Sequence, residues 1–424
     1  MSISTSMRRL TSFCIIFILA LISRSHSQVE ELQFEKISIE SGLSQSSVLC
    51  IYQDHKNFIW FGTYAGLNRY DGYNFKVYKA EPGNPNSLSN NNVECIVEDH
   101  SGNIWIGTED GLNRYDRGKE KFTTYRNDPD DPTSLSTNYI RSLYEDRQGV
   151  LWVGTYGGGL NKFDQDSNKF IRYLHDADNP KSLSHNNVLC ILEDRQGRLW
   201  VGTDGGLNYF DRQKGEFVHF LHDPKNPKSL SHDSIWRLYE DRAGNLWIAS
   251  WGGGLNLFDP EKNQASRYQN DDANPYSLSN NVARSICEDR DGNLWIGTDG
   301  GGLDIMNPRD KDKNRFLHYK SNPNDPNSLS SNALLSIFRD RSGIIWIGTN
   351  FGGINKYNPD RRKFAHYRGR SGDTNSLKNS SILAIYGDSL GFIWLGTNGG
   401  GLNRFDRKTN TYTQYTYSPG TRTV

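Results

Sequence analysis

Trp236 and Trp251 are the residues whose types best suit the recognition of a ligand in this chain of 424 residues. Flat aromatic faces suit sugar rings, and guanidinium groups beside them suit an acidic group. The chain is repetitive, and other repeats carry different residues at these two positions. The pattern therefore predicts a site for a neutral or an acidic oligosaccharide. The residues predicted to form this site are Trp236, Trp251, Tyr64, Tyr156, Arg141 and Arg284. The alternative is that the two indoles only plug the centre of the molecule.

Catalytic groups are less evident. His185 and His232 occupy equivalent loop positions of adjacent repeats, but no carboxylate pair or nucleophile–base spacing accompanies them. We interpret them as solvated loop histidines and expect no catalytic residue. A propeller lyase or hydrolase is the less favoured alternative.

Metal and cofactor chemistry is not predicted either. One Asp recurs in every repeat, but each repeat lacks the cage of oxygens that calcium needs, so we interpret it as a turn former. The glycines at 157–159 follow a strand and open no helix, which is unlike a phosphate-binding loop. No Cys/His cluster has the spacing of metal ligands. We expect no metal and no cofactor.

The elements that position these residues come from an eightfold repeat. A tryptophan recurs at intervals of 45 to 51 residues, at Trp60, Trp105, Trp152, Trp200, Trp247, Trp295, Trp346 and Trp394. Each copy contains four short strands, as at 188–193, 199–203, 206–210 and 216–220. The first strand is apolar on both faces, as expected for a strand between neighbouring blades. The pattern predicts an all-β propeller of four-stranded blades, with the repeated tryptophans in its core.

The hairpin of the fifth repeat brings the two additional tryptophans together. If its first two strands pair around Ala243, Trp236 falls opposite about residue 250, so the two indoles are predicted to be neighbours.

The number of blades in the ring is open between seven and eight. Residues 34–39 match the outer strand of a repeat but precede the first inner strand, so they can close a ring. Phe58 and Phe392 make the eighth unit resemble the first, and residues 363–367 could serve a second ring in the same way. We expect a seven-bladed propeller over 32–358 and, over 359–424, an eighth repeat that begins a second propeller. The alternative is one eight-bladed ring.

The N-terminus has the pattern of a signal peptide over 1–27. Arg8 and Arg9 precede an apolar run of 13 residues, and Ser25 and Ser27 suit a signal peptidase. The run is shorter than the roughly 20 residues of a spanning helix. We expect a periplasmic or secreted protein without a membrane span in the mature chain, a signal anchor being the alternative. The formal net charge of zero argues against a basic nucleic-acid surface.

Cys50, Cys95 and Cys190 share one repeat position, which holds Ser or Ala in most other repeats. We call this position the inner slot. Cys287 lies elsewhere, and we expect all four to be free, buried thiols. Arg237 is the exception in the inner slot, and the sequence offers no reason for it.

The segment from Asp289 to Leu303, Asp-x-x-Gly-x-x-Trp-x-Gly-Thr followed by Gly-Gly-Leu, resembles the two-component regulator propeller repeat. The resemblance covers residues 32 to about 417. It implies the extracytoplasmic sensor of a hybrid histidine kinase, often one that responds to polysaccharide breakdown products. The family's β-sandwich, membrane helix and kinase have no counterpart here, so only the sensing half is implied. We expect a non-catalytic, carbohydrate-sensing propeller, or alternatively a scaffold that binds a protein partner.

Overall fold

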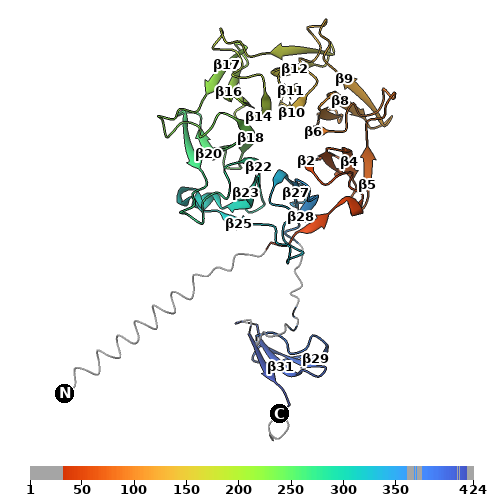
Figure 1. Ribbon diagram of the computed structural model, residues 1–424, viewed down its shortest axis with the longest axis vertical. Helices are drawn as coiled ribbons and strands as arrows, with labels where there is room; N and C mark the ends of the chain where they lie inside the picture. The colour runs from red at the N-terminus through yellow and green to blue at the C-terminus, as the bar shows by residue number, and fades with distance from the viewer. Residues whose placement is uncertain are drawn as a thin grey trace, which may run out of the picture. The chain divides into compact units, whose positions relative to one another are not determined.

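The computed structural model describes residues 32–360, 367, 369, 375–407, 409 and 411–417. Within them the strands form eight four-stranded antiparallel sheets, so the predicted all-β propeller with four-stranded blades is confirmed (Figure 1). The chain divides into two compact units, residues 1–359 and 360–424. The predicted signal peptide lies outside the described residues. No helix among the described residues is long and apolar enough to cross a membrane.

The described part of the first unit holds seven sheets and two short 3-10 helices, η1 (Ile39–Ser41) and η2 (Pro308–Lys313). From inner to outer strand, the sheets are β2 to β5 (Val48–Gln53, Ile59–Thr63, Gly66–Tyr70, Phe75–Tyr78), β6 to β9 (Val93–Glu98, Ile104–Thr108, Gly111–Asp116, Lys121–Tyr125), β10 to β13 (Ile140–Glu145, Leu151–Thr155, Leu160–Asp164, Lys169–Tyr173), β14 to β17 (Val188–Glu193, Leu199–Thr203, Gly206–Asp211, Glu216–Phe220), β18 to β21 (Ile235–Glu240, Leu246–Ser250, Gly254–Asp259, Gln264–Tyr268), β22 to β25 (Ala283–Glu288, Leu294–Thr298, Gly302–Met306, Leu317–Tyr319), and β26, β27, β28 and β1 (Leu334–Arg339, Ile345–Thr349, Ile354–Tyr357, Glu35–Ile37).

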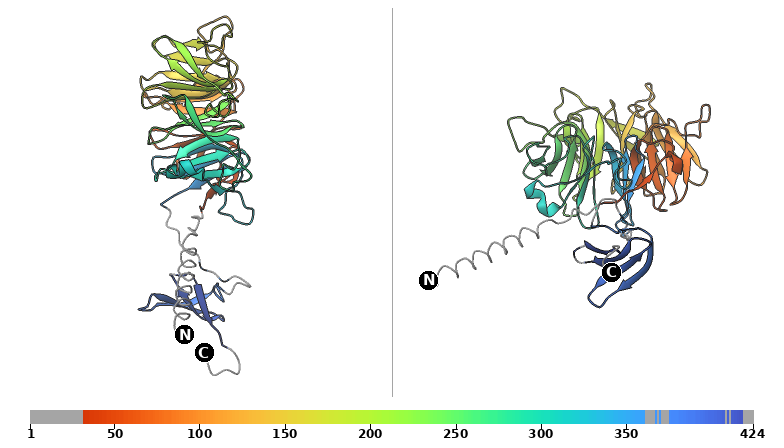
Figure 2. Two further views of the ribbon diagram at one scale, coloured as in Figure 1. Left: turned by 90° about the vertical axis from the view of Figure 1, so that its left-hand side faces the viewer. Right: turned by 60° about the horizontal axis from the view of Figure 1, so that its bottom comes forward.

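The ring closes between its first and last blades. The N-terminal strand β1 is the outer strand of the last sheet, where Glu35 lies opposite Lys356 and Ile37 opposite Ile354. The inner strand of that sheet, β26, contacts β2 of the first blade. Phe34, just before β1, is buried against Tyr357, with ring centroids 6.1 Å apart. The seven sheets therefore form a closed ring, in which the last blade contacts the first (Figures 1 and 2).

The repeated Asp and Trp are joined to each other. In all eight repeats the indole Nε1–H donates a hydrogen bond of 2.7 to 3.0 Å to a carboxylate oxygen of the Asp six residues earlier. In the fifth blade the other oxygen of Asp241 accepts from the backbone N–H groups of Ala243 and Asn245. The Asp thus holds the turn and also satisfies the only polar group of a buried indole.

The second unit contains β29 to β32 (Ile382–Gly387, Phe392–Thr397, Gly401–Asp406, Thr411–Tyr415). Its inner-strand residues Leu383 and Ile385 are 72% and 69% exposed, whereas the equivalent Leu189 and Ile191 of the ring are 7% and 9% exposed. Leu189 and Ile191 belong to β14, an inner strand that contacts the inner strands of both neighbouring blades. That this unit begins a second propeller stays a prediction, and the segment 363–366 on which it partly rests lies outside the described residues.

Candidate functional site

The side chains of the candidate site come from a distortion that every inner strand carries. Each inner strand slips by one residue against its neighbour, as between Ile235 and Arg237 in the fifth blade. A β-bulge of this kind leaves one residue unpaired and redirects its side chain. In the ring the bulged residues are Leu49, Glu94, Arg141, Leu189, Trp236, Arg284 and Leu335.

The predicted register of the fifth hairpin, paired around Ala243, holds from Arg237–Ala249 to Glu240–Leu246. It ends at the bulge: Ser250 pairs with Ile235, so Trp236 itself has no partner across the hairpin. The sequence argument assumed a regular ladder and missed the bulge. The two indoles are nevertheless neighbours, because Trp251 follows directly after β19.

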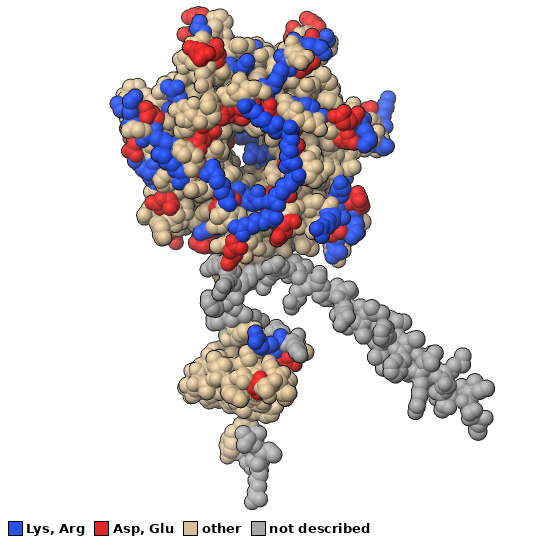
Figure 3. All heavy atoms as spheres, turned by 180° about the vertical axis from the view of Figure 1, so that it is seen from behind, with Lys and Arg blue, Asp and Glu red and all other residues tan. Residues whose placement is uncertain are grey.

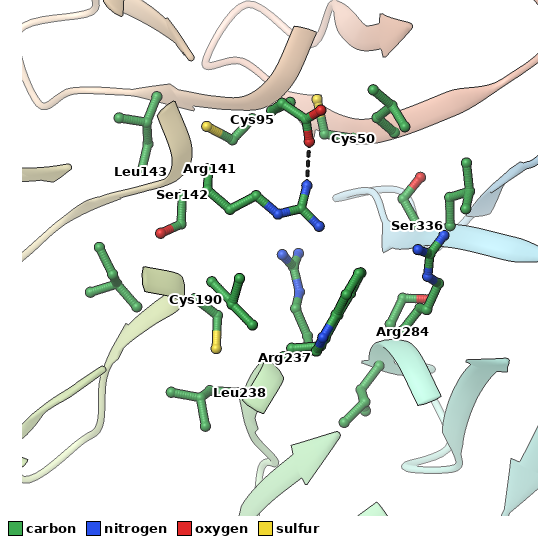
Figure 4. Close-up of a pocket in the computed structure, with 18 of the residues that line it drawn as sticks. Cys50, Cys95, Arg141, Ser142, Leu143, Cys190, Arg237, Leu238, Arg284 and Ser336 are labelled. Atoms are coloured by element: carbon green, nitrogen blue, oxygen red, sulfur yellow. Dashed lines mark hydrogen bonds and ion pairs between the residues drawn. The ribbon is translucent and has the colours of Figure 1, made fainter. Parts of the chain in front are cut away.

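The seven inner strands enclose a central cavity of about 1020 Å³ (Figure 4). All six residues of the predicted site line it: Tyr64, Arg141, Tyr156, Trp236, Trp251 and Arg284. They come from the first, third, fifth and sixth blades, so closure of the ring brings them together. On one face of the ring, Lys and Arg side chains gather around the central opening (Figure 3).

The two indoles form a stacked pair. The ring centroids of Trp236 and Trp251 are 4.6 Å apart with an interplanar angle of 26°. Trp236 Nε1 donates to Ser234 Oγ at 3.0 Å, and that hydroxyl donates to Asp204 at 2.6 Å. The backbone N–H of Trp251 donates to the carbonyl of Ser234 at 3.0 Å. These hydrogen bonds to Ser234 hold the pair in place. Trp251 remains 39% exposed, so the pair is also accessible to solvent.

Both predicted arginines contact this pair and each has a carboxylate close by, although the buried Nε of Arg284 makes no hydrogen bond. The guanidinium of Arg284 lies 4.8 Å from the ring centroid of Trp236 and 5.3 Å from that of Trp251. Arg141 lies 5.2 Å from the Trp236 centroid and forms an ion pair with Glu94. Arg284 faces Asp299 at 3.5 Å. Burial lowers the pKa of Arg284, and Asp299 partly offsets this effect.

The tyrosines form the remainder of the rim. Tyr64 and Tyr156 are each 48% exposed. Tyr156 packs against Tyr139, with ring centroids 5.5 Å apart, and the Tyr139 hydroxyl donates to Glu94 at 3.5 Å. Sequence reasoning did not single out Tyr139. The residue at its position differs between repeats; in the fifth blade the equivalent residue is Ser234. That variation could have identified Tyr139 from the sequence.

The two loop histidines have a local role. Nδ1 of His185 accepts from the backbone N–H of Asn187, and Nδ1 of His232 accepts from that of Ser234, both at 3.0 Å. Each imidazole therefore caps its own loop. Among the described residues, no group of three or more His, Cys, Asp or Glu side chains could hold a metal ion. The four cysteines of the described residues are free, as predicted; Cys190 and Cys287 are buried, whereas Cys50 and Cys95 are only partly buried.

Eight segments of the chain match the family model described as two component regulator propeller: residues 42–65, 87–110, 134–157, 182–205, 229–252, 277–300, 328–351 and 376–399. A curated relative, histidine kinase P4 of Formosa agariphila, is 37% identical over 82 residues, which are 19% of this chain and 6% of the kinase.

Solved structures show the same fold. The extracellular domain of a putative hybrid two component system from B. thetaiotaomicron superposes with a TM-score of 0.72 at 30% identity, over 91% of this chain and 49% of that one. A second such domain from B. thetaiotaomicron gives a TM-score of 0.61 at 22% identity, over 91% and 54%. A virginiamycin B lyase from Staphylococcus aureus, at 13% identity and a TM-score of 0.57, covers 77% of this chain and 99% of its own, and shares the fold alone.

The chain spans about half the length of these two extracellular domains and a small part of the curated kinase. The repeated Asp–Trp turn, the four-stranded blades and the eight matched segments agree with one another. The chain belongs to the two component regulator propeller family.

Proposed function

We propose that this chain is the ligand-binding part of an extracytoplasmic sensor and that it binds an oligosaccharide at the mouth of its central cavity. The observation that carries the proposal is the stacked pair of Trp236 and Trp251, which is open to solvent and flanked by Arg141 and Arg284. The likeness to extracellular domains of putative hybrid two component systems supports the sensing role.

The pair suits a sugar because it is rigid and partly exposed. Hydrogen bonds fix the orientation of Trp236 before any ligand arrives, so little conformational entropy is lost on binding. Trp251 is 39% exposed, and Tyr64 and Tyr156, each 48% exposed, extend the aromatic rim. Burying such a face stabilises a complex by about 1.5–3 kcal/mol. The cavity mouth thus combines aromatic surface with a few polar groups, as small-molecule sites do.

A glycan array tests this function. Purified protein comprising residues 28–424 is applied to an array of neutral, uronic-acid and sulfated oligosaccharides, beside the Trp251→Ala variant. We expect selective binding that the variant loses. If the folded protein binds no glycan, or if the variant keeps the whole binding profile, the carbohydrate proposal is wrong. A partner of another class, such as a protein, would then have to be sought at the same face.

Export is the second part of the proposal. It rests on Arg8, Arg9 and the apolar run that follows them. Mass spectrometry of the protein from its natural host should find a mature N-terminus near Gln28. An intact Met1 on soluble cytoplasmic protein would contradict export.

A further inference from the structure

Arg237 is the residue of the inner slot that the repeat does not explain. In the other blades of the ring this slot holds Cys or Ser, and the residue opposite it on the second strand is Gly. The glycine is needed: a Cβ on Gly107 or Gly202 would lie 2.5 Å from the sulfur of Cys95 or Cys190. The slot side chain therefore fills the space that this glycine leaves.

The fifth blade reverses this arrangement. Ala249 stands in place of the glycine, opposite Arg237, and its methyl group is completely buried. Because Ala249 occupies the space, the side chain at position 237 has to leave the slot. Arg237 is exposed and lines the central cavity, and in Figure 4 its side chain points toward the centre of that cavity. The two substitutions act together and place a guanidinium inside the channel.

The charges of the cavity wall leave this guanidinium unmatched. The acidic residues of the wall already have partners: Glu94 pairs with Arg141, Asp204 accepts from Asn187 and Ser234, and Glu288 accepts from the backbone N–H of Arg242. Among the described residues, the guanidiniums of Arg237 and Arg339 line the cavity without a hydrogen bond or an ion pair to the protein.

The two unmatched arginines lie at different heights of the channel. Arg237 directly follows the bulged Trp236, whereas Arg339 ends its strand at the level of Ile345. Arg237 is therefore the unmatched cation that is nearer to the stacked indoles.

We propose that Arg237 is the specificity-determining residue of the site and that it binds an oxyanion, a carboxylate or a sulfate, inside the channel. The sugar ring that carries this group then rests against Trp236 and Trp251 at the mouth. That the molecule bearing this oxyanion is a sugar rests on the proposed function; the oxyanion site itself does not. A guanidinium without a protein partner in a confined cavity is suited to charge-assisted, bidentate binding of such a group.

Inorganic sulfate tests the oxyanion site without any sugar. The full mature chain is titrated with sodium sulfate at constant ionic strength, adjusted with sodium chloride, while tryptophan fluorescence and the melting temperature are recorded. We expect saturable binding to the wild type and weakening of about tenfold or more in Arg237→Gln, because charge-assisted hydrogen bonds are lost. Arg237→Lys should retain part of the affinity.

The matched control is Arg339→Gln, which removes the same charge from another height of the same cavity. It should change the sulfate affinity by less than about threefold, as expected for a distant charge. Equal weakening in both variants would overturn the proposal in favour of a diffuse positive potential. The absence of saturable binding to the folded wild type would also overturn it.

Glycan binding by the same variants distinguishes the oxyanion proposal from the carbohydrate proposal. Sulfate binding that depends on Arg237, together with an empty glycan array, would leave the oxyanion site standing and refute only the carbohydrate. Glycan binding that Arg237→Gln leaves unchanged, for acidic and neutral sugars alike, would refute Arg237 as the determinant while keeping the aromatic site. Loss of acidic but not neutral glycans in this variant is the result that we expect.

Discussion

The stacked rings of Trp236 and Trp251 are joined through one residue, Ser234. Its hydroxyl accepts from the Trp236 indole and its carbonyl accepts from the Trp251 backbone. Neither tryptophan belongs to the repeated Asp–Trp core, in which Trp247 is the member from the same blade. The fifth blade therefore contains a tryptophan for folding and two more whose positions face the cavity.

The Asp–Trp turn makes a prediction about stability. Asp241→Ala removes the acceptor of the buried Trp247 Nε1–H and of two backbone N–H groups, so it should lower the free energy of unfolding by about 1–3 kcal/mol. Asp259→Ala is the control, because this carboxylate also accepts from two backbone N–H groups but at an exposed turn and from no buried indole; it should cost less than Asp241→Ala. Urea unfolding followed by fluorescence measures both. Equal losses would mean that the buried hydrogen bond carries no special weight.

Ring closure predicts an asymmetry between the two ends of the chain. Deleting residues 28–40 removes β1 and exposes the edge of β28, whereas deleting residues 368–424 leaves the pairing of all seven blades in place. The first deletion should therefore lower the melting temperature of the ring far more than the second. Differential scanning calorimetry of the two truncated proteins measures this. If both deletions lower it equally, the seventh blade does not depend on β1.

One buried ion pair makes the stability depend on pH. Asp304 replaces the Asn of the other repeats, and His318 Nδ1 lies 2.5 Å from its carboxylate. The hydrogen bond to Asp304 raises the pKa of His318, against the effect of burial. A raised pKa in the folded state stabilises the protein below the unfolded pKa of about 6.5, and this stabilisation is lost as the pH rises through the folded value.

The variant Asp304→Asn isolates this effect. The difference in free energy of unfolding between wild type and variant should favour the wild type more at about pH 5.5 than at about pH 9. Urea unfolding at the two pH values measures the difference. A difference that does not change with pH would show that the pair does not titrate.

The blades could be predicted well because the same turn, strands and buried Trp occur in all eight repeats. The sequence could also predict the residues around the cavity, because positions that vary between copies are not needed by the blade. It could not predict the bulge at Trp236, which depends on the backbone of two strands together. It also could not explain Arg237, because the reason lies in Ala249 across the hairpin.

The sequence also could not show whether the arginines of the site have acidic partners within the protein. The sequence offered Arg141 and Arg284 for an acidic group of the ligand, but Glu94 forms an ion pair with Arg141 and Asp299 lies 3.5 Å from Arg284. Glu94 comes from the blade before Arg141, and Asp299 lies in the same blade as Arg284. The pairing of Glu94 with Arg141 becomes visible only when neighbouring blades are placed side by side.

Calorimetric titration with an oligosaccharide that the wild type binds on the array tests the central claim most directly. Trp251→Ala and Trp236→Ala should each weaken this binding about tenfold or more, since the lost stacking is worth about 1.5–3 kcal/mol, and leave the melting temperature nearly unchanged. Trp247→Ala, a core change, should instead destabilise the fold by about 3–5 kcal/mol. If the two site variants lower stability as much as Trp247→Ala does, the indoles are packing inside the channel and the binding site is wrong.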